Sequence, residues 1–213
     1  MKERNTVQYA VAAALAVMIV CYLAFQRIKT IPGHSKALSI TVKCAATAMA
    51  VVAALIGCIK NPQPAYWIIL AGLAVCTIAD GVLCVRFITG GAIFGLGHVL
   101  YIVAFCVMRR PTWASLILFA ALLGLVTAFF SRYRKRIGRR LPLVLGYATL
   151  LCLMVSMALP QKPLFFAGAL LFAASDALLA YLAVDRNHMW LDYISLGAYY
   201  LGQFLLALAI VIG

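Results

Sequence analysis

Long apolar runs, separated by short polar segments, follow one another along the chain. Many runs are about 20 residues long, the length that an α-helix needs to cross a hydrocarbon core of ~30 Å. Apolar and polar residues do not alternate within them, so the strands of a membrane barrel are not indicated. A backbone in lipid must satisfy its own polar groups, which favours helices. We expect eight spans, at residues 6–25, 37–59, 65–85, 92–108, 113–130, 141–159, 164–184 and 192–212.

The segments between the spans carry turn and charge signals. All are short, so the sequence predicts a single transmembrane domain over residues 1–213, an all-α integral membrane protein built as an eight-helix bundle. The first run follows a basic N-terminus, as in a signal peptide. We nevertheless interpret it as a span, because it is too long for a typical signal core and no A-x-A-like site follows it. The breaks fall at IPGHSK, KNPQP, RFITGG, RRP, SRYRKRIGRR, PQKP and DRNHMW.

Composition agrees with lipid as the solvent, since 66% of the residues are hydrophobic and 11% are charged. Soluble domains are about half apolar and about a quarter charged. The net charge of +13 raises the question of nucleic acid. Most Lys and Arg residues, however, lie in short loops, where such residues set topology and contact lipid headgroups. We therefore expect the bilayer, and no nucleic acid, as a partner. The cysteines lie in or beside apolar runs without ligand spacing, and we interpret them as small hydrophobes.

The loop charges also predict an orientation. An even number of spans puts both termini on one side of the membrane. Lys and Arg are more frequent in the loops on the other side, mainly because of the basic loop 131–140. The positive-inside rule then predicts a multi-pass protein of the cell membrane with this loop in the cytoplasm and both termini outside.

Four ionisable side chains lie inside predicted spans: Lys43, Asp80, His98 and Asp176. An Asp, Lys or Arg near the centre of a membrane helix costs about 2.5–3.5 kcal/mol on insertion scales, so such residues are functional candidates that face the bundle interior. Weaker candidates are the polar residues Tyr101, Tyr147, Ser175, Tyr199 and Gln203.

These candidates share a depth in the membrane. Even-numbered spans start, and odd-numbered spans end, at the same face, which the charge distribution predicts to be cytoplasmic. At ~1.5 Å per residue, the candidates lie roughly 9–16 Å below that face, as expected for a shared pocket. Helical spacing predicts three inward-facing stripes. They are Ser39, Lys43 and Thr47; Phe94, His98, Tyr101 and Phe105; and Ser195, Tyr199 and Gln203.

Each candidate also has a structural alternative. Lys43 is expected either to neutralise an aspartate or to take part in chemistry, and His98 is either a core histidine or a site residue. The tyrosines serve equally in packing, and Gln203 in joining helices. Two aspartates at one depth favour function. Asp185 and Asp192 lie in or beside a loop and are expected to be solvated.

Metal and cofactor chemistry is not indicated. With one histidine inside the spans, a three-histidine zinc site cannot be built there, although a metal held by carboxylates stays open. The sequence has no HExxH, no GxxxxGK[ST] and no G-x-S-x-G motif. We therefore predict no cofactor and no metal ligands.

Five segments resemble the YhhN-type membrane family, which includes the lysoplasmalogenases. Each motif is weak alone, but their order and spacing are specific, and together they cover the second to the eighth span. Family members often have Pro after the lysine of the second span, where this chain has Cys44. The segments are VKCAATAM, TIADGVL, FGLGHVLYIVAF, GALLFAASDALLAY and AYYLGQFLLA.

The resemblance implies hydrolysis of the vinyl ether bond of lysoplasmalogens, with a lysophospholipid as the substrate and a fatty aldehyde and a glycerophospho-base as the products. Such hydrolysis needs a positioned acid to protonate carbon and a negative charge beside the resulting cation, which two carboxyl groups in different protonation states supply. Burial and a nearby carboxylate both favour the protonated form of one. We predict Asp80 and Asp176 as this catalytic pair, with the other polar candidates binding substrate.

Two other functions remain open. A transporter of ions or small molecules also uses buried Asp, Lys and His residues, although its helices are often broken at midplane, whereas the prolines here lie near span ends. A lipid-binding membrane protein without turnover is the second alternative.

Overall fold

The protein is a bundle of long α-helices. The computed structural model describes residues 2–184, 188 and 190–213. Among these residues, eight helices are long and apolar enough to cross a membrane, which confirms the predicted class. They are α1 (Lys2–Thr30), α2 (Lys36–Lys60), α3 (Pro64–Leu83), α4 (Phe87–Met108), α5 (Trp113–Arg132), α7 (Leu141–Ala158), α8 (Pro163–Val184) and α9 (Trp190–Val211), with the short α6 (Arg134–Ile137) and η1 (Gly138–Arg140) before α7.

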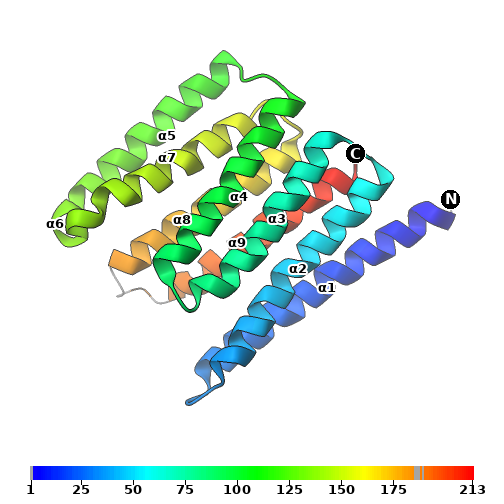
Figure 1. Ribbon diagram of the computed structural model, residues 1–213, viewed down its shortest axis with the longest axis horizontal. Helices are drawn as coiled ribbons and strands as arrows, with labels where there is room; N and C mark the ends of the chain where they lie inside the picture. Colours follow the sequence, from blue (N-terminus) through cyan, green and yellow to red (C-terminus); the bar gives the residue numbers. More distant parts are fainter. Residues whose placement is uncertain (1, 185–187, 189) are drawn as a thin grey trace.

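The helices run side by side, and most chain neighbours pack as hairpins (Figure 1). Helices α4 and α5 are the exception, and α7 packs against both of them. Helix α9 packs against both α8 and α2, and α4 packs against α3 and α7. Helices α1 and α5 lie at opposite edges, packed mainly on α2 and α7 respectively. Both termini lie at one end of the bundle and the basic α6 at the other (Figure 1). The prediction that the termini share a side is therefore confirmed.

Some predicted boundaries were wrong. Helix α1 continues past residue 25 to Thr30, and α4 begins at Phe87 instead of residue 92. The glycines of RFITGG suggested a turn, but Gly90 is helical and lies against the backbone of Leu83, where an added Cβ would come within 2.5 Å of Leu83 Cα. The basic loop contains α6 and η1. Asp185 and Arg186 of the predicted last loop lie outside the described residues.

Small residues bring two helix pairs close together. A Cβ on Gly168 of α8 would lie 2.9 Å from the carbonyl oxygen of Gly202 in α9, and one on Gly97 of α4 would lie 2.6 Å from Cys76 Sγ in α3. Side chains larger than hydrogen would push these helices apart. Gly91 of α4, in contrast, has open space around it.

The three predicted polar stripes face the interior. All their residues are buried, including Lys43 on α2, His98 on α4 and Gln203 on α9. Because their spacing follows one face of a helix, the periodicity alone was sufficient to identify that face.

Candidate functional site

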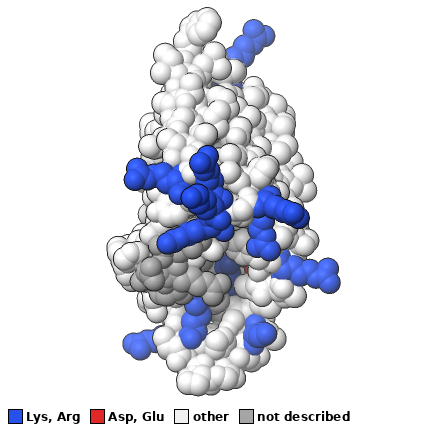
Figure 2. Space-filling model, turned by 90° about the vertical axis from the view of Figure 1, so that its left-hand side faces the viewer, with Lys and Arg blue, Asp and Glu red and all other residues white. Residues whose placement is uncertain are grey.

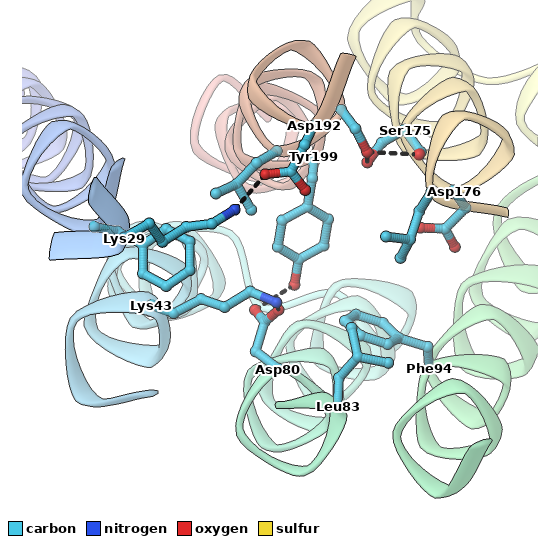
Figure 3. A pocket seen from close by; sticks show the side chains of 13 residues that line it. Lys29, Lys43, Asp80, Leu83, Phe94, Ser175, Asp176, Asp192 and Tyr199 are labelled. Atoms are coloured by element: carbon cyan, nitrogen blue, oxygen red, sulfur yellow. Dashed lines mark hydrogen bonds and ion pairs between the residues drawn. The ribbon is translucent and has the colours of Figure 1, made fainter. Parts of the chain in front are cut away.

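A pocket opens among six helices toward the basic end of the bundle. Its volume is about 170 Å³. Figure 2 shows this end, where Lys and Arg side chains surround a small hollow, and atoms of an acidic residue are visible inside it. Figure 3 shows Asp80 and Asp176 reaching into the pocket from α3 and α8. The lining consists of Phe25, Lys29, Lys43, Asp80, Leu83, Phe94, Ser175, Asp176, Leu179, Asp192, Ser195, Leu196 and Tyr199.

Asp80 is held by three groups from two other helices. Lys43 Nζ lies 2.9 Å from Asp80 Oδ1, and both side chains are buried, with 11% and 1% of their surface exposed. The hydroxyls of Thr47 and Tyr199 donate to Asp80 Oδ2 at 2.5 Å and 2.7 Å. An ammonium group and two hydroxyl donors all stabilise the ionised form of a carboxyl group. Asp80 is therefore surrounded by groups that stabilise a negative charge.

Asp176 has different partners. The Tyr147 hydroxyl donates to Asp176 Oδ2 at 2.5 Å, and His98 Nε2 lies 3.3 Å from the same oxygen. His98 Nε2 is also 3.0 Å from the Tyr147 hydroxyl, so the three side chains form a compact group. The Asp176 side chain is 10% exposed, toward the pocket. Neither partner is a permanent cation, in contrast to Lys43 at Asp80.

The imidazole ring of His98 lies in apolar surroundings. The ring is fully buried, and its centroid lies 4.7 Å from that of Phe172. His98 Nδ1 is buried without a hydrogen-bond partner among the described residues. An imidazolium would carry an unpaired N–H there, which is costly in an apolar environment.

The two carboxyl groups thus share a pocket but differ in environment. Asp80 is paired with a lysine, whereas Asp176 is paired with a tyrosine hydroxyl and a histidine ring. Carboxyl groups set apart in this way are how enzymes obtain an acid and a negative charge in one site. The apolar part of the lining, which includes Leu83, Phe94, Leu179 and Leu196, suits a hydrocarbon chain.

Ser175 joins the pocket through the α8–α9 contact. Ser195 Oγ donates to the carbonyl oxygen of Ser175 at 2.8 Å, and the two hydroxyl oxygens are 3.3 Å apart. Both side chains line the pocket next to Asp176. The pair fixes the two helices that carry Asp176 and Tyr199 relative to each other.

Two predicted site residues lie elsewhere. Tyr101 and Gln203 are fully buried, and neither lines the pocket. The Tyr101 hydroxyl donates to Gln203 Oε1 at 3.1 Å and lies 3.7 Å from Cys76 Sγ. They form a separate polar contact that joins α3, α4 and α9. Of the other candidates, Lys43, Ser175 and Tyr199 line the pocket with the aspartates, while His98 and Tyr147 support Asp176.

Three site residues were missed or misjudged in the sequence. Asp192, expected to be solvated, forms an ion pair with Lys29, and both line the pocket. Lys29 follows the first predicted span, among the loop residues that the sequence analysis interprets as topology signals. Thr47 lay on the predicted stripe one turn after Lys43, which was the available signal for its contact with Asp80.

No three His, Cys, Asp or Glu side chains of the described residues are grouped as metal ligands would be.

Comparison with known proteins gives one match. The model of the YhhN family matches residues 38–210, from the start of α2 to the end of α9. This range contains both aspartates and all their partners. No curated protein matches the chain, and neither does any solved structure.

Proposed function

Because this chain is a member of the YhhN family, we propose that it is an intramembrane hydrolase that cleaves the vinyl ether bond of lysoplasmalogens. The observation that carries the proposal is the placement of Asp80 and Asp176 in one pocket with different partners. Hydrolysis of a vinyl ether needs a proton donor and a negative charge beside the resulting cation, and two carboxyl groups with different partners can supply both. The resemblance to lysoplasmalogenases supplies the substrate class.

In this mechanism Asp176 is the acid. Its carboxylic acid proton moves to the alkenyl carbon that is not bonded to oxygen, and the electrons of the C=C bond form the new C–H bond. Asp176 becomes a carboxylate, and the other alkenyl carbon becomes an oxocarbenium ion. Tyr147 stabilises the carboxylate as it forms, because its hydroxyl donates to Asp176 Oδ2. His98 Nε2 lies 3.3 Å from the same oxygen and adds a second donor in the tautomer that carries its proton on Nε2.

Asp80 is the fixed negative charge. It stabilises the cation across the pocket while Lys43 keeps it ionised. Water then adds to the cationic carbon, and its proton passes to the Asp176 carboxylate. The hemiacetal collapses by breaking the bond to the glycerol oxygen, which takes up a proton from Asp176 while the hemiacetal hydroxyl loses one. The products are the aldehyde and a glycerophospho-base, and Asp176 regains its starting state with the proton released from that hydroxyl.

Tyr199 has a positioning role in this scheme. Its hydroxyl donates to Asp80 Oδ2, and its ring packs edge-on to Phe94 and Phe172 with centroids 5.8 Å and 5.2 Å away. The ring thereby fixes the hydroxyl in direction. The substrate chain would lie along the neighbouring apolar lining.

The test is aldehyde release from lysoplasmenyl-ethanolamine by the purified protein. We expect release by the wild type and its loss in Asp176→Asn and Asp80→Asn. The second variant leaves Lys43 unpaired, so Lys43→Met/Asp80→Asn, which removes both charges, serves as the folded counterpart. Thermal unfolding and gel filtration verify that each variant is intact. Near-normal release by a folded Asp176→Asn protein would refute the mechanism, and no release by the wild type would leave the lipid-binding alternative.

A further inference from the structure

A second lysine–aspartate pair lines the pocket, nearer its mouth. Lys29 lies in the last turn of α1 and pairs with Asp192 in the first turn of α9. Their side chains are 36% and 25% exposed, against 11% and 1% for the inner pair of Lys43 and Asp80. Figure 3 shows Lys29 and Lys43 extending side by side from α1 and α2 toward the two aspartates.

We propose that Lys29 and Asp192 form a headgroup site that exchanges their mutual ion pair for the phosphate and the ammonium group of a zwitterionic lysophospholipid. The phosphate forms an ion pair with Lys29, and the ammonium group forms one with Asp192. The assignment rests on the proposed function, because it treats the pocket as a lipid site.

The outer pair is the one that can open. An ion pair between partly exposed side chains contributes about 0–1 kcal/mol, because water stabilises the separated charges nearly as well. Breaking a buried pair costs several times more, since each charge would be left in an apolar environment. A ligand at the mouth can therefore displace Asp192 from Lys29 while Lys43 and Asp80 stay together.

The charges of the lining favour a zwitterionic headgroup. Among the residues that the structure describes, two lysines and three aspartates line the pocket. A headgroup whose only charged group is a phosphate would pair with Lys29 and separate it from Asp192. The Asp192 carboxylate would then be unpaired and close to the negative phosphate. A headgroup that also carries an ammonium group neutralises Asp192. The site therefore discriminates by charge, since like charges at short range disfavour the wrong ligand.

The position of the pair agrees with a lipid lying along the pocket. Phe25, also in the lining, is one helical turn before Lys29, whose Nζ lies 5.5 Å from the Phe25 ring centroid. A headgroup held there places the glycerol and the alkenyl bond further in, toward Asp80 and Asp176. Lys29 lies before the residues that the family model matches, and Asp192 lies within them. The first helix thus adds a recognition element to the site.

Two variants that break the same ion pair give the test. Lys29→Gln leaves Asp192, and Asp192→Asn leaves Lys29. The probes are lysophosphatidylethanolamine and lysophosphatidylglycerol with an ester-linked saturated chain, which contain no vinyl ether. Their dissociation constants are measured with the purified protein in detergent by native mass spectrometry. Arg27→Gln, an exposed residue of the same helix turn outside the pocket lining, is the control.

We expect the wild type to bind the ethanolamine lipid at least about tenfold more tightly than the glycerol lipid, a ratio that a single well-placed charge supplies. Asp192→Asn should bind the glycerol lipid more tightly than the wild type does, and Lys29→Gln should bind both lipids more weakly. Arg27→Gln should behave as the wild type.

If the two variants changed the dissociation constants of both lipids equally, the headgroup site would be overturned, because an ion pair with only a structural role is lost in both variants. Equal affinity of the wild type for both lipids would overturn it as well. These measurements do not depend on turnover. Their failure is therefore distinct from a failure of the proposed hydrolysis, which shows as absent aldehyde with intact binding.

Discussion

Lys43 Nζ lies 2.9 Å from Asp80 Oδ1 in the interior of the bundle, and the two residues come from neighbouring helices, α2 and α3. The carboxylate also accepts hydrogen bonds from Thr47 and Tyr199, so its negative charge is stabilised from three sides. The pair therefore contributes to helix packing and fixes the electrostatics of the pocket. Its two roles are separable by experiment.

Replacing Lys43 by Met should destabilise the protein by about 3–5 kcal/mol, because a buried carboxylate loses its cation. Lys43→Met/Asp80→Asn should recover most of that loss, since no uncompensated charge remains. Reversible unfolding in mixed detergent and denaturant measures both. Aldehyde release should be absent in the single and in the double variant. Equal destabilisation by the single and the double change would show that the pair is not coupled.

Tyr147→Phe should lower the rate of aldehyde release by about tenfold to a hundredfold, since it removes a hydrogen bond to the charged form of Asp176. Tyr101→Phe is the matched control, because it removes a buried hydroxyl that contacts Gln203 outside the pocket lining. Steady-state kinetics of the two folded variants gives the comparison. A larger loss of rate in Tyr101→Phe than in Tyr147→Phe would place the reacting bond elsewhere.

The helices and their inward faces were predictable because lipid imposes length and periodicity on a span. Lys43, Thr47 and Asp80 were accordingly expected to face the interior. The pairing of Lys43 with Asp80, and of His98 with Asp176, was not predictable, because sequence fixes depth but not which helices are neighbours. Lys43 and His98 lie at the same predicted depth, so either of them was a possible partner for either aspartate.

Which residues line the pocket could not be predicted from the sequence either. Tyr101 and Gln203 share the spacing of the site residues and yet meet each other in a separate contact, since Tyr101 lies about one turn beyond His98 along α4. Asp192 was expected to be solvated because it follows a loop. The end of α1, which continues past the predicted span, brings Lys29 to it.

Gly202→Ala should destabilise the bundle by about 1–3 kcal/mol, the cost of overpacking a close contact. A Cβ at this position would lie 2.9 Å from the carbonyl oxygen of Gly168 and 3.0 Å from the backbone nitrogen of Phe172. Gly124→Ala on α5 has open space and should be neutral or slightly stabilising. Thermal unfolding of the two variants tests this. Equal midpoints would mean that α8 and α9 are not held at this separation.

The orientation of the bundle is open to direct labelling. With the basic loop in the cytoplasm, a thiol introduced by Lys135→Cys should react with a membrane-impermeant maleimide only after lysis, whereas one introduced by Lys60→Cys should react in intact cells. Both positions are exposed and lie at opposite ends of the bundle. The wild type, with its seven native cysteines, gives the background. The expected pattern follows from the excess of Lys and Arg around α6.

Because the pocket opens toward the end of the bundle that carries α6, this labelling pattern would also mean that substrate headgroups reach Lys29 and Asp192 from the cytoplasmic leaflet. Labelling of Lys135→Cys in intact cells would reverse the orientation and put the mouth of the pocket outside.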